Sequence, residues 1–211
     1  MNSVPNIIFD LGGVVLDIDY NLTRDAFIKL RFKDFETIYS QLKQELIFDL
    51  FETGRITAAD FRDVIRNYAE KKFEDSQIDA AWNAMIVKMP AERVALLKEL
   101  KKHYRLFLLS NTNEIHEKEF IRNITSSFGK NILPELFEKM YYSHSSGIRK
   151  PDTEIFKLIL KENQLAAEET LFIDDSPQHV EGALKAGLQA LLLDHKKTTL
   201  ENLVAGFTSK P

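Results

Sequence analysis

The chain has 211 residues, of which 44% are hydrophobic and 28% are charged, a composition typical of a globular protein with one sizeable core or with a core and a small accessory domain. The formal net charge of −4 provides no general attraction to nucleic acid or to an anionic membrane, so we expect neither as a partner and predict a small diffusible substrate. The absence of cysteine excludes disulfides, thiolate zinc sites and a cysteine nucleophile, and without a signal-peptide pattern or an apolar run of roughly 20 residues the chain is expected to be cytoplasmic.

The first predicted element is a short buried strand that ends in a carboxylate. Residues 7–9 form an apolar run rich in strand formers, and Asp10 follows directly, with Gly12 and Gly13 after it. A carboxylate at the carboxyl end of a strand, next to glycines that allow a ligand close to the backbone, is well placed for chemistry.

The next seventy residues predict a helical insertion at 20–89. Apolar residues recur there at helical spacings without the glycine and proline punctuation of strands. Thr57 is a predicted helix N-cap. We expect Phe48, Phe51 and Trp82 to pack inside the insertion rather than to contact a substrate.

From Pro90 onward, strands and helices alternate. Short apolar runs predict strands at 106–109, 140–143, 171–173 and 189–193, with helical patterns in between. This alternation predicts a parallel α/β sheet with right-handed crossovers. Because ligands of such sheets bind at the carboxyl ends of the strands, we expect Asp10, Ser110 and the pair Asp174 and Asp175 to lie near one another.

Four separated segments carry a family resemblance: FDLGGV at 9–14, LSNT at 109–112, RKPD at 149–152 and FIDD at 172–175. Their order and their places after predicted strands resemble the haloacid dehalogenase-like hydrolase superfamily. Within this superfamily, the sequences of the four motifs are similar to those of bacterial α-D-glucose-1-phosphate phosphatases and of the phosphatase domain of soluble epoxide hydrolases. The resemblance implies a Rossmann-like core at 1–19 and 90–211 with an inserted all-helical cap domain at 20–89.

The resemblance also implies a mechanism, in which a phosphatase hydrolyses a small phosphorylated metabolite through an aspartyl phosphate on Asp10. Such a site needs positive charge, because a carboxylate and a phosphate dianion repel each other. The family pattern assigns Mg²⁺ to Asp10, the main-chain carbonyl of Gly12 and Asp175, with Asp174 behind them. It assigns the remaining charge compensation to Lys150, and the binding of the phosphate to Lys150, Ser110 and the amide of Asn111.

One position departs from the family pattern. Most phosphatases of the superfamily have a second aspartate two residues after the nucleophile, which acts as general acid and base, and here that position is Gly12. A sugar 1-phosphate is therefore the predicted substrate, because its hemiacetal oxygen is a better leaving group than an ordinary alcohol. Asp17, Asp19 and Asp174 are left as candidates for the missing acid and base, and His116 and His179 receive no role.

Three alternatives remain open. Relatives that dehalogenate 2-haloacids also lack the second aspartate, but they work without metal, which would make the pair Asp174 and Asp175 superfluous. A phosphonate hydrolase needs a cap lysine, and no lysine of the insertion stands out. A non-catalytic phosphometabolite-binding relative would have no need of the nucleophile Asp10. Monomer and homodimer are both compatible with the sequence.

Overall fold

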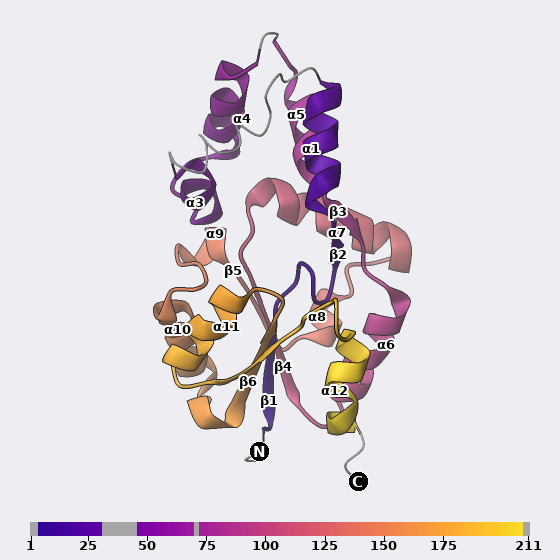
Figure 1. Cartoon of the computed structure of the whole chain (residues 1–211), viewed down its shortest axis with the longest axis vertical. Helices are drawn as coiled ribbons and strands as arrows, with labels where there is room; N and C mark the ends of the chain where they lie inside the picture. The colour runs from indigo at the N-terminus through magenta and orange to yellow at the C-terminus, as the bar shows by residue number, and fades with distance from the viewer. Residues whose placement is uncertain (1–3, 31–45, 70–71, 209–211) are drawn as a thin grey trace.

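The computed structural model describes residues 4–30, 46–69 and 72–208. Its centre is a parallel five-stranded sheet in the order β5-β4-β1-β6-β7 (Figure 1). The strands are β1 (Asn6–Phe9), β4 (Arg105–Ser110), β5 (Lys139–Tyr142), β6 (Thr170–Asp174) and β7 (Gln189–Leu192). The predicted α/β fold class is therefore confirmed, and each predicted strand is present with small shifts of its ends.

The register of the sheet brings the carboxyl ends of the central strands together. Phe9 of β1 pairs with Leu108 of β4 on one side and with Ile173 of β6 on the other. Each of these strands ends within two residues of its pair, so Asp10, Ser110 and Asp174 lie along one edge of the sheet.

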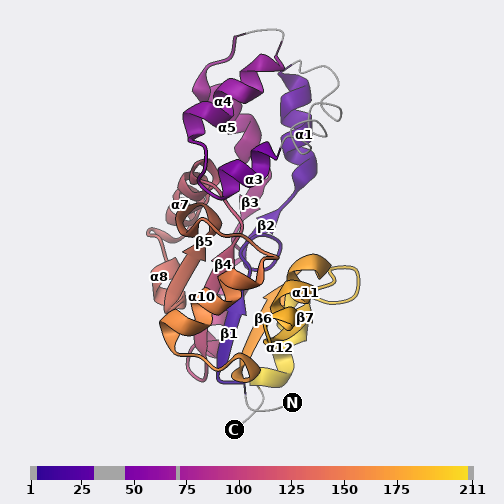
Figure 2. The same cartoon turned by 90° about the vertical axis from the view of Figure 1, so that its left-hand side faces the viewer.

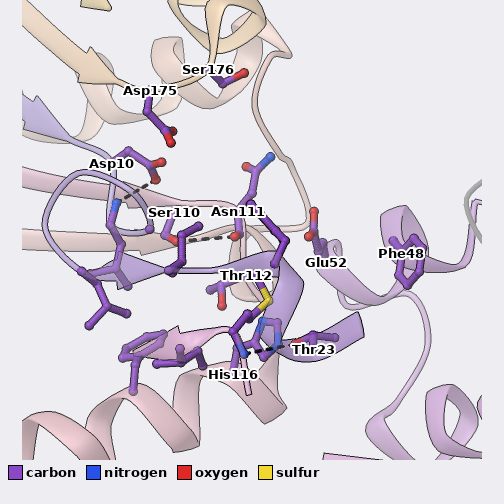
Figure 3. A pocket seen from close by; sticks show the side chains of 18 of the residues that line it. Asp10, Thr23, Phe48, Glu52, Ser110, Asn111, Thr112, His116, Asp175 and Ser176 are labelled. Carbon is purple, nitrogen blue, oxygen red and sulfur yellow. Dashed lines mark hydrogen bonds between the residues drawn. The ribbon is translucent and has the colours of Figure 1, made fainter. Parts of the chain in front are cut away.

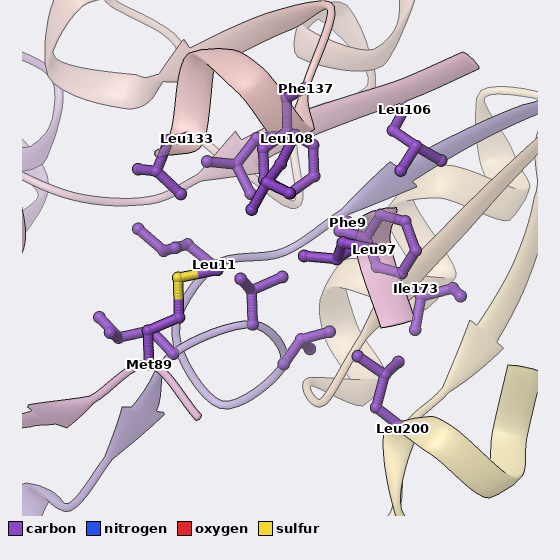
Figure 4. Close-up of a cluster of buried hydrophobic side chains, with 14 of the residues drawn as sticks. Phe9, Leu11, Met89, Leu97, Leu106, Leu108, Leu133, Phe137, Ile173 and Leu200 are labelled. Atoms are coloured by element: carbon purple, nitrogen blue, oxygen red, sulfur yellow. The ribbon is translucent and has the colours of Figure 1, made fainter. Parts of the chain in front are cut away.

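Helices cover both faces of the sheet, because alternate residues of each strand point to opposite sides. On one face pack α6 (Ala91–Leu100), α7 (Glu114–Phe128), α8 (Leu133–Leu136) and α12 (Leu200–Thr208). On this face Phe9, Leu106 and Ile173 form a buried cluster with Leu97 and Leu133 (Figure 4). The other face carries α10 (Thr153–Asn163) and α11 (Pro177–Lys185), which pack on the intervening strand residues. Shorter turns are α9 (Ser143–Ser146) and the 3₁₀ helix Ala167–Glu169.

The remaining helices pack at the far end of the molecule, beyond the carboxyl ends of the strands (Figures 1 and 2). They are α1 (Tyr20–Lys29), α3 (Ile47–Glu52), α4 (Ala58–Asn67) and α5 (Asp75–Asn83). Phe51 stacks on Phe61 with ring centroids 4.4 Å apart, and Phe48 stacks on Trp82 at 5.4 Å. These rings form a separate buried cluster, as expected from the sequence. Thr57 caps α4 in a capping box with Asp60, which confirms that prediction.

Two short strands connect the helical part to the sheet. β2 (Asp17–Ile18) pairs antiparallel with β3 (Ile86–Lys88). The sequence analysis assigned residues 86–88 to the helical insertion, because three residues are too few to show a strand period. Residues 31–45 of the predicted insertion lie outside the described part of the chain, and the domain limits at 19/20 and 89/90 stay a prediction. None of the described helices is long and apolar enough to cross a membrane.

Candidate active site

A buried ammonium group lies at the centre of the site. Lys150 Nζ is 2.7 Å from Asp10 Oδ1 and 2.6 Å from Asp174 Oδ2, and the lysine side chain is only 1% exposed. Burial by itself would lower the pKa of Lys150, but attraction by the two carboxylates outweighs it and raises the pKa. A lysine before a proline is commonly solvated. Here, by contrast, the contact of Lys150 with both carboxylates shows that segment 149–152 reaches the carboxyl edge of the sheet.

Three carboxylates converge on this lysine. Oxygen atoms of Asp10, Asp174 and Asp175 lie within 4.8 Å of one another. Burial raises the pKa of Asp10 to about 7, against the lowering effect of Lys150, and burial also raises the pKa of Asp175. Three carboxylates against one ammonium leave two negative charges, which a divalent cation would balance. Carboxylate oxygens are the ligands that Mg²⁺ prefers, so the residues fit such an ion.

Asp174 is held more tightly than the other two carboxylates. Its side chain is fully buried and accepts hydrogen bonds from Lys150 Nζ and, at 2.7 Å, from the Ser176 amide. His179 Nδ1 lies 3.0 Å from Asp174 Oδ2. Burial would raise the pKa of Asp174, but Lys150 and His179 lower it to about 2. Asp174 thus positions Lys150.

His179 is a residue of the site that the sequence analysis left without a role. It sits in the first turn of α11, which starts directly after the Asp174 strand end. Side chains in the first turn of a helix can reach back to the preceding strand end, and that position is the signal that was available in the sequence.

The loop between β1 and β2 places Gly13 directly beside the Asp175 carboxylate. Gly13 has a φ of +80°, and a Cβ atom there would lie 2.2 Å from Asp175 Oδ2. Only glycine fits, because any other residue would be strained and would displace the carboxylate. The Leu11 amide donates to Asp10 Oδ1 at 2.7 Å, so the same loop orients the Asp10 side chain.

The substitution Gly13→Ala is expected to remove phosphate-releasing activity and to lower the free energy of unfolding by more than the ~1–2 kcal/mol of backbone strain. The additional loss comes from the contact with Asp175. Gly129→Ala is the matched control, because Gly129 has a φ of +78° and nothing within 4 Å of its Cβ position. Chemical denaturation and phosphate release measure the two variants. Equal stability losses and retained activity in Gly13→Ala would contradict this role of Gly13.

Asn111 joins two of the sequence motifs. Its Nδ2 donates to the Lys150 carbonyl and its Oδ1 accepts from the Lys150 amide, both at 2.9 Å. The side chain therefore fixes the backbone at Lys150. Ser110 is buried at the end of β4 and lines the cavity beside Asp10, as expected. The neighbouring Thr112 amide donates to Ser143 Oγ at 2.9 Å, which holds the β4 and β5 ends together.

Two acidic candidates for proton transfer lie elsewhere. Asp17 Oδ1 forms an ion pair with Arg93 Nη1 at 2.8 Å, on β2, and it does not line the cavity. Asp19 accepts from the Asn21 amide at 2.9 Å as the N-cap of α1. The structure does not bring either carboxylate to the cluster around Lys150.

A cavity of about 660 Å³ opens between the sheet edge and the helical part. Asp10, Asp175 and Ser110 line it from the sheet, while Phe48 and Glu52 line it from α3 (Figure 3). Trp82 also lines the cavity, so Phe48 and Trp82 contribute both to the helical core and to the wall.

His116 braces this wall. Its Nε2 lies 3.2 Å from the Trp82 carbonyl, and its Nδ1 lies 3.2 Å from Asn113 Nδ2. Because a carbonyl only accepts, Nε2 carries the proton and Nδ1 accepts from Asn113. Burial lowers the pKa of His116 to about 4, so the ring is neutral near pH 7. His116 therefore connects α7 to α5, a long-range contact that no local sequence pattern indicates.

Glu52 is the second cavity residue that the sequence analysis missed. Its Oε2 lies 3.1 Å from Arg149 Nη2, but it is shielded from solvent and makes no hydrogen bond within the described residues. Burial raises the pKa of Glu52 to about 7. Arg149 also forms an ion pair with Asp49, one turn earlier on α3.

Residues 4–187 match the protein family described as haloacid dehalogenase-like hydrolase. The chain is 31% identical over 186 residues to a D-ribitol-5-phosphate phosphatase from Bacteroides thetaiotaomicron, covering 88% of this chain and 90% of the relative. It is 28% identical over 200 residues to a sesquiterpene phosphatase from Aspergillus oryzae, covering 92% of each. Among solved structures, a family enzyme from Bacteroides thetaiotaomicron in complex with magnesium and inorganic phosphate aligns with a TM-score of 0.85 and 36% identity, over 93% of this chain and 97% of that one.

Proposed function

Since this chain belongs to the haloacid dehalogenase-like hydrolase family and is a phosphatase, we propose that it hydrolyses a small phosphorylated sugar or polyol through an aspartyl phosphate on Asp10, with Mg²⁺ as cofactor. The observation that carries the proposal is the Lys150 ammonium, 2.7 Å from Asp10 Oδ1 and beside two further carboxylates, of which Asp175 lines the cavity together with Asp10 and Lys150. A catalytically silent binder would have no use for this arrangement.

Asp10 attacks the phosphorus atom, and the bond from phosphorus to the ester oxygen breaks. Water then attacks the aspartyl phosphate, which releases inorganic phosphate and regenerates the Asp10 carboxylate. Lys150 and the Leu11 amide both contact Asp10 Oδ1, so they hold the carboxylate in one orientation throughout. Lys150 offsets the charge that builds up between the carboxylate and the phosphate.

Asp10, Asp175 and the main-chain carbonyl of Gly12 are the residues that would hold Mg²⁺. The bound ion supplies electrostatic stabilisation to the phosphate oxygens. Asp174 Oδ2 lies 2.6 Å from Lys150 Nζ and keeps the lysine in place. We therefore do not propose Asp174 as a metal ligand. Ser110 and the Asn111 amide, at the end of β4, are the proposed hydrogen-bond donors to the phosphate.

The wall of the cavity combines apolar side chains with polar groups that suit a hydroxylated substrate. Asn21, Arg24, Glu52 and Arg149 all line the cavity and place polar groups above the carboxylate cluster. A volume of about 660 Å³ accommodates a pentose or hexose phosphate, or the corresponding polyol. A relative named for D-ribitol 5-phosphate agrees with this chemistry. The narrower preference for sugar 1-phosphates stays a prediction from the sequence.

A panel of phosphate esters tests the proposal. With Mg²⁺ present, we expect phosphate release from pentitol and sugar phosphates and little from an isoprenyl monophosphate. Chelation by EDTA should reduce the rate to background, and added Mg²⁺ should restore it, because two negative charges of the carboxylate cluster then lose their counter-ion. Sugar 1-phosphates and 6-phosphates are compared in the same assay.

Several outcomes would contradict the proposal. No release from any ester would reject the phosphatase mechanism, and release that is indifferent to EDTA would reject the metal. Halide release from a 2-haloacid in the presence of EDTA would favour the dehalogenase alternative. Equal turnover of sugar 1-phosphates and 6-phosphates would reject only the predicted preference for the better leaving group.

A further inference from the structure

Glu52 faces the nucleophile from the helical wall of the cavity. It is the last residue of α3, and it lines the same cavity as Asp10 (Figure 3). Lys150 lines this cavity too. Arg149 Nη2 lies 3.1 Å from Glu52 Oε2, and the next residue along the chain, Lys150, contacts Asp10. Two side chains that are neighbours in the sequence, Arg149 and Lys150, therefore connect α3 to the carboxylate cluster.

The reaction lacks a proton carrier at the sheet edge. Gly12 has no side chain, whereas the leaving oxygen of an ordinary alcohol must be protonated as it departs. In phosphoryl transfer the attacking and leaving oxygens are roughly in line, so the ester oxygen departs on the side opposite Asp10. That side of the cavity is formed by the helical part, where α3 lies.

Few acidic side chains reach that side. Among the described residues that line the cavity, the acids are Asp10, Asp49, Glu52 and Asp175, and only Asp49 and Glu52 come from the helical part. Asp49 is half exposed and is already paired with Arg149 through a hydrogen bond. Glu52 Oε2 is shielded from solvent, and its ion pair with Arg149 does not include a hydrogen bond from any described residue. A buried carboxyl oxygen without a hydrogen bond is costly unless a ligand supplies one.

We infer that Glu52 is the general acid and general base of this phosphatase, an inference that rests on the proposed function. In the first step the Glu52 carboxyl group gives its proton to the ester oxygen, as the bond from phosphorus to that oxygen breaks and the bond to Asp10 forms. In the second step the Glu52 carboxylate takes a proton from water, as the water oxygen bonds to phosphorus and the bond to Asp10 breaks. Glu52 thus regains in the second step the proton that it gives up in the first.

The electrostatic surroundings suit this cycle. Burial raises the pKa of Glu52 to about 7, while Lys150 lowers it and Asp10 raises it by smaller amounts. A general acid works best with a pKa near the operating pH. The acid form is present below about pH 7 and is lost above it, so the first step should slow as the pH rises through about 7. The charged or titratable groups around Glu52 are Arg149 and Lys150, Asp10, Asp49 on the same helix and His144 of the adjoining α9.

A carboxyl group at Glu52 also changes the expected substrate. With a proton available for the leaving oxygen, an ordinary alcohol ester such as a polyol phosphate can be hydrolysed despite Gly12. The sugar 1-phosphate is then no longer required by the missing aspartate.

The test compares Glu52→Gln with the wild type on two esters that differ in their need for a proton. A pentitol phosphate needs protonation of its leaving oxygen, so we expect kcat to fall about 100-fold. p-Nitrophenyl phosphate leaves without a proton, so its first step should persist while the second step slows. Rapid mixing should then show a burst of about one p-nitrophenolate per active site, followed by slow turnover. The decline in rate above about pH 7 should disappear in the variant.

Asp63→Asn is the control, because it removes an exposed carboxylate of the helical part that pairs with Arg66 and does not line the cavity. Its kcat is expected to stay within about threefold of the wild type and to show no burst. Glu52→Asp retains a carboxyl group and serves if the glutamine variant does not fold. It should keep the high-pH decline at a reduced kcat.

The inference is overturned if Glu52→Gln, folded by circular dichroism, hydrolyses the pentitol phosphate as fast as Asp63→Asn. It is also overturned if both esters slow equally without a burst. These results require an active wild-type enzyme, so they are distinct from a failure of the proposed function, in which the wild type itself releases no phosphate.

Discussion

Asp10→Asn is expected to reduce phosphate release by at least about 10³-fold. The amide cannot form the covalent phosphate, because its oxygen is a far weaker nucleophile than a carboxylate. The amide has nearly the same shape, and its oxygen can still accept from the Leu11 amide, which lies 2.7 Å from Asp10 Oδ1. Steady-state phosphate release with Mg²⁺ measures the effect.

The fold of this variant should persist. Asp10→Asn leaves Lys150 paired with Asp174 at 2.6 Å and removes one of three crowded carboxylates. Thermal unfolding followed by circular dichroism is the control, and we expect a midpoint no lower than that of the wild type. An Asp10→Asn variant with wild-type turnover would exclude an aspartyl phosphate at this position. A loss of activity accompanied by unfolding would carry no information on the nucleophile, and the covalent phosphate would then be trapped in the wild type.

Lys150→Met is expected to lower the free energy of unfolding by about 3–5 kcal/mol and to remove activity as well. The methionine fills a similar volume, so the loss comes from charge. Asp10 and Asp174 are left buried and facing each other without the ammonium that lies 2.7 Å and 2.6 Å from them. Denaturant unfolding gives the stability, and phosphate release at a temperature where the variant is folded gives the activity.

Two comparisons isolate the charge effect. Lys157→Met removes an exposed lysine that pairs with Glu154 at 2.7 Å, and it should change stability little. The double variant Lys150→Met with Asp174→Asn should recover part of the lost stability, because one uncompensated carboxylate is gone. If Lys150→Met and Lys157→Met unfold alike, the central ion pair does not stabilise the fold and the charge argument for the site fails.

The sequence predicted well which side chains lie at the strand ends of the site. Asp10, Ser110 and Asp174 each follow a short apolar run, and parallel strands with this pattern end at one edge of a sheet. These predictions depend on local pattern and on a topological rule, both of which one sequence contains. Lys150 was instead placed at the site by the family resemblance of the RKPD segment, and its ammonium contacts Asp10.

The sequence predicted that the helical part exists, but it did not predict which of its side chains face the cavity. Helical spacing placed Phe51 and Trp82 in a shared core, which the structure confirms. The period shows which side chains face inward, but it does not orient one helix against another part of the chain. The ribbon of β2 and β3 escaped notice for the same reason, since strand pairing between residues 17–18 and 86–88 is a long-range contact.

By itself, the sequence determined the sheet, the strand ends and the carboxylates that meet there, because each follows from the pattern of its own segment. Only the tertiary structure decided that Glu52 and Arg149 lie across the cavity, that His179 supports Asp174, and that Asp17 is instead paired with Arg93. Contacts of this second kind depend on how α3 docks over the sheet edge. That docking is the sum of many weak packing terms spread over the chain, and no short segment records it.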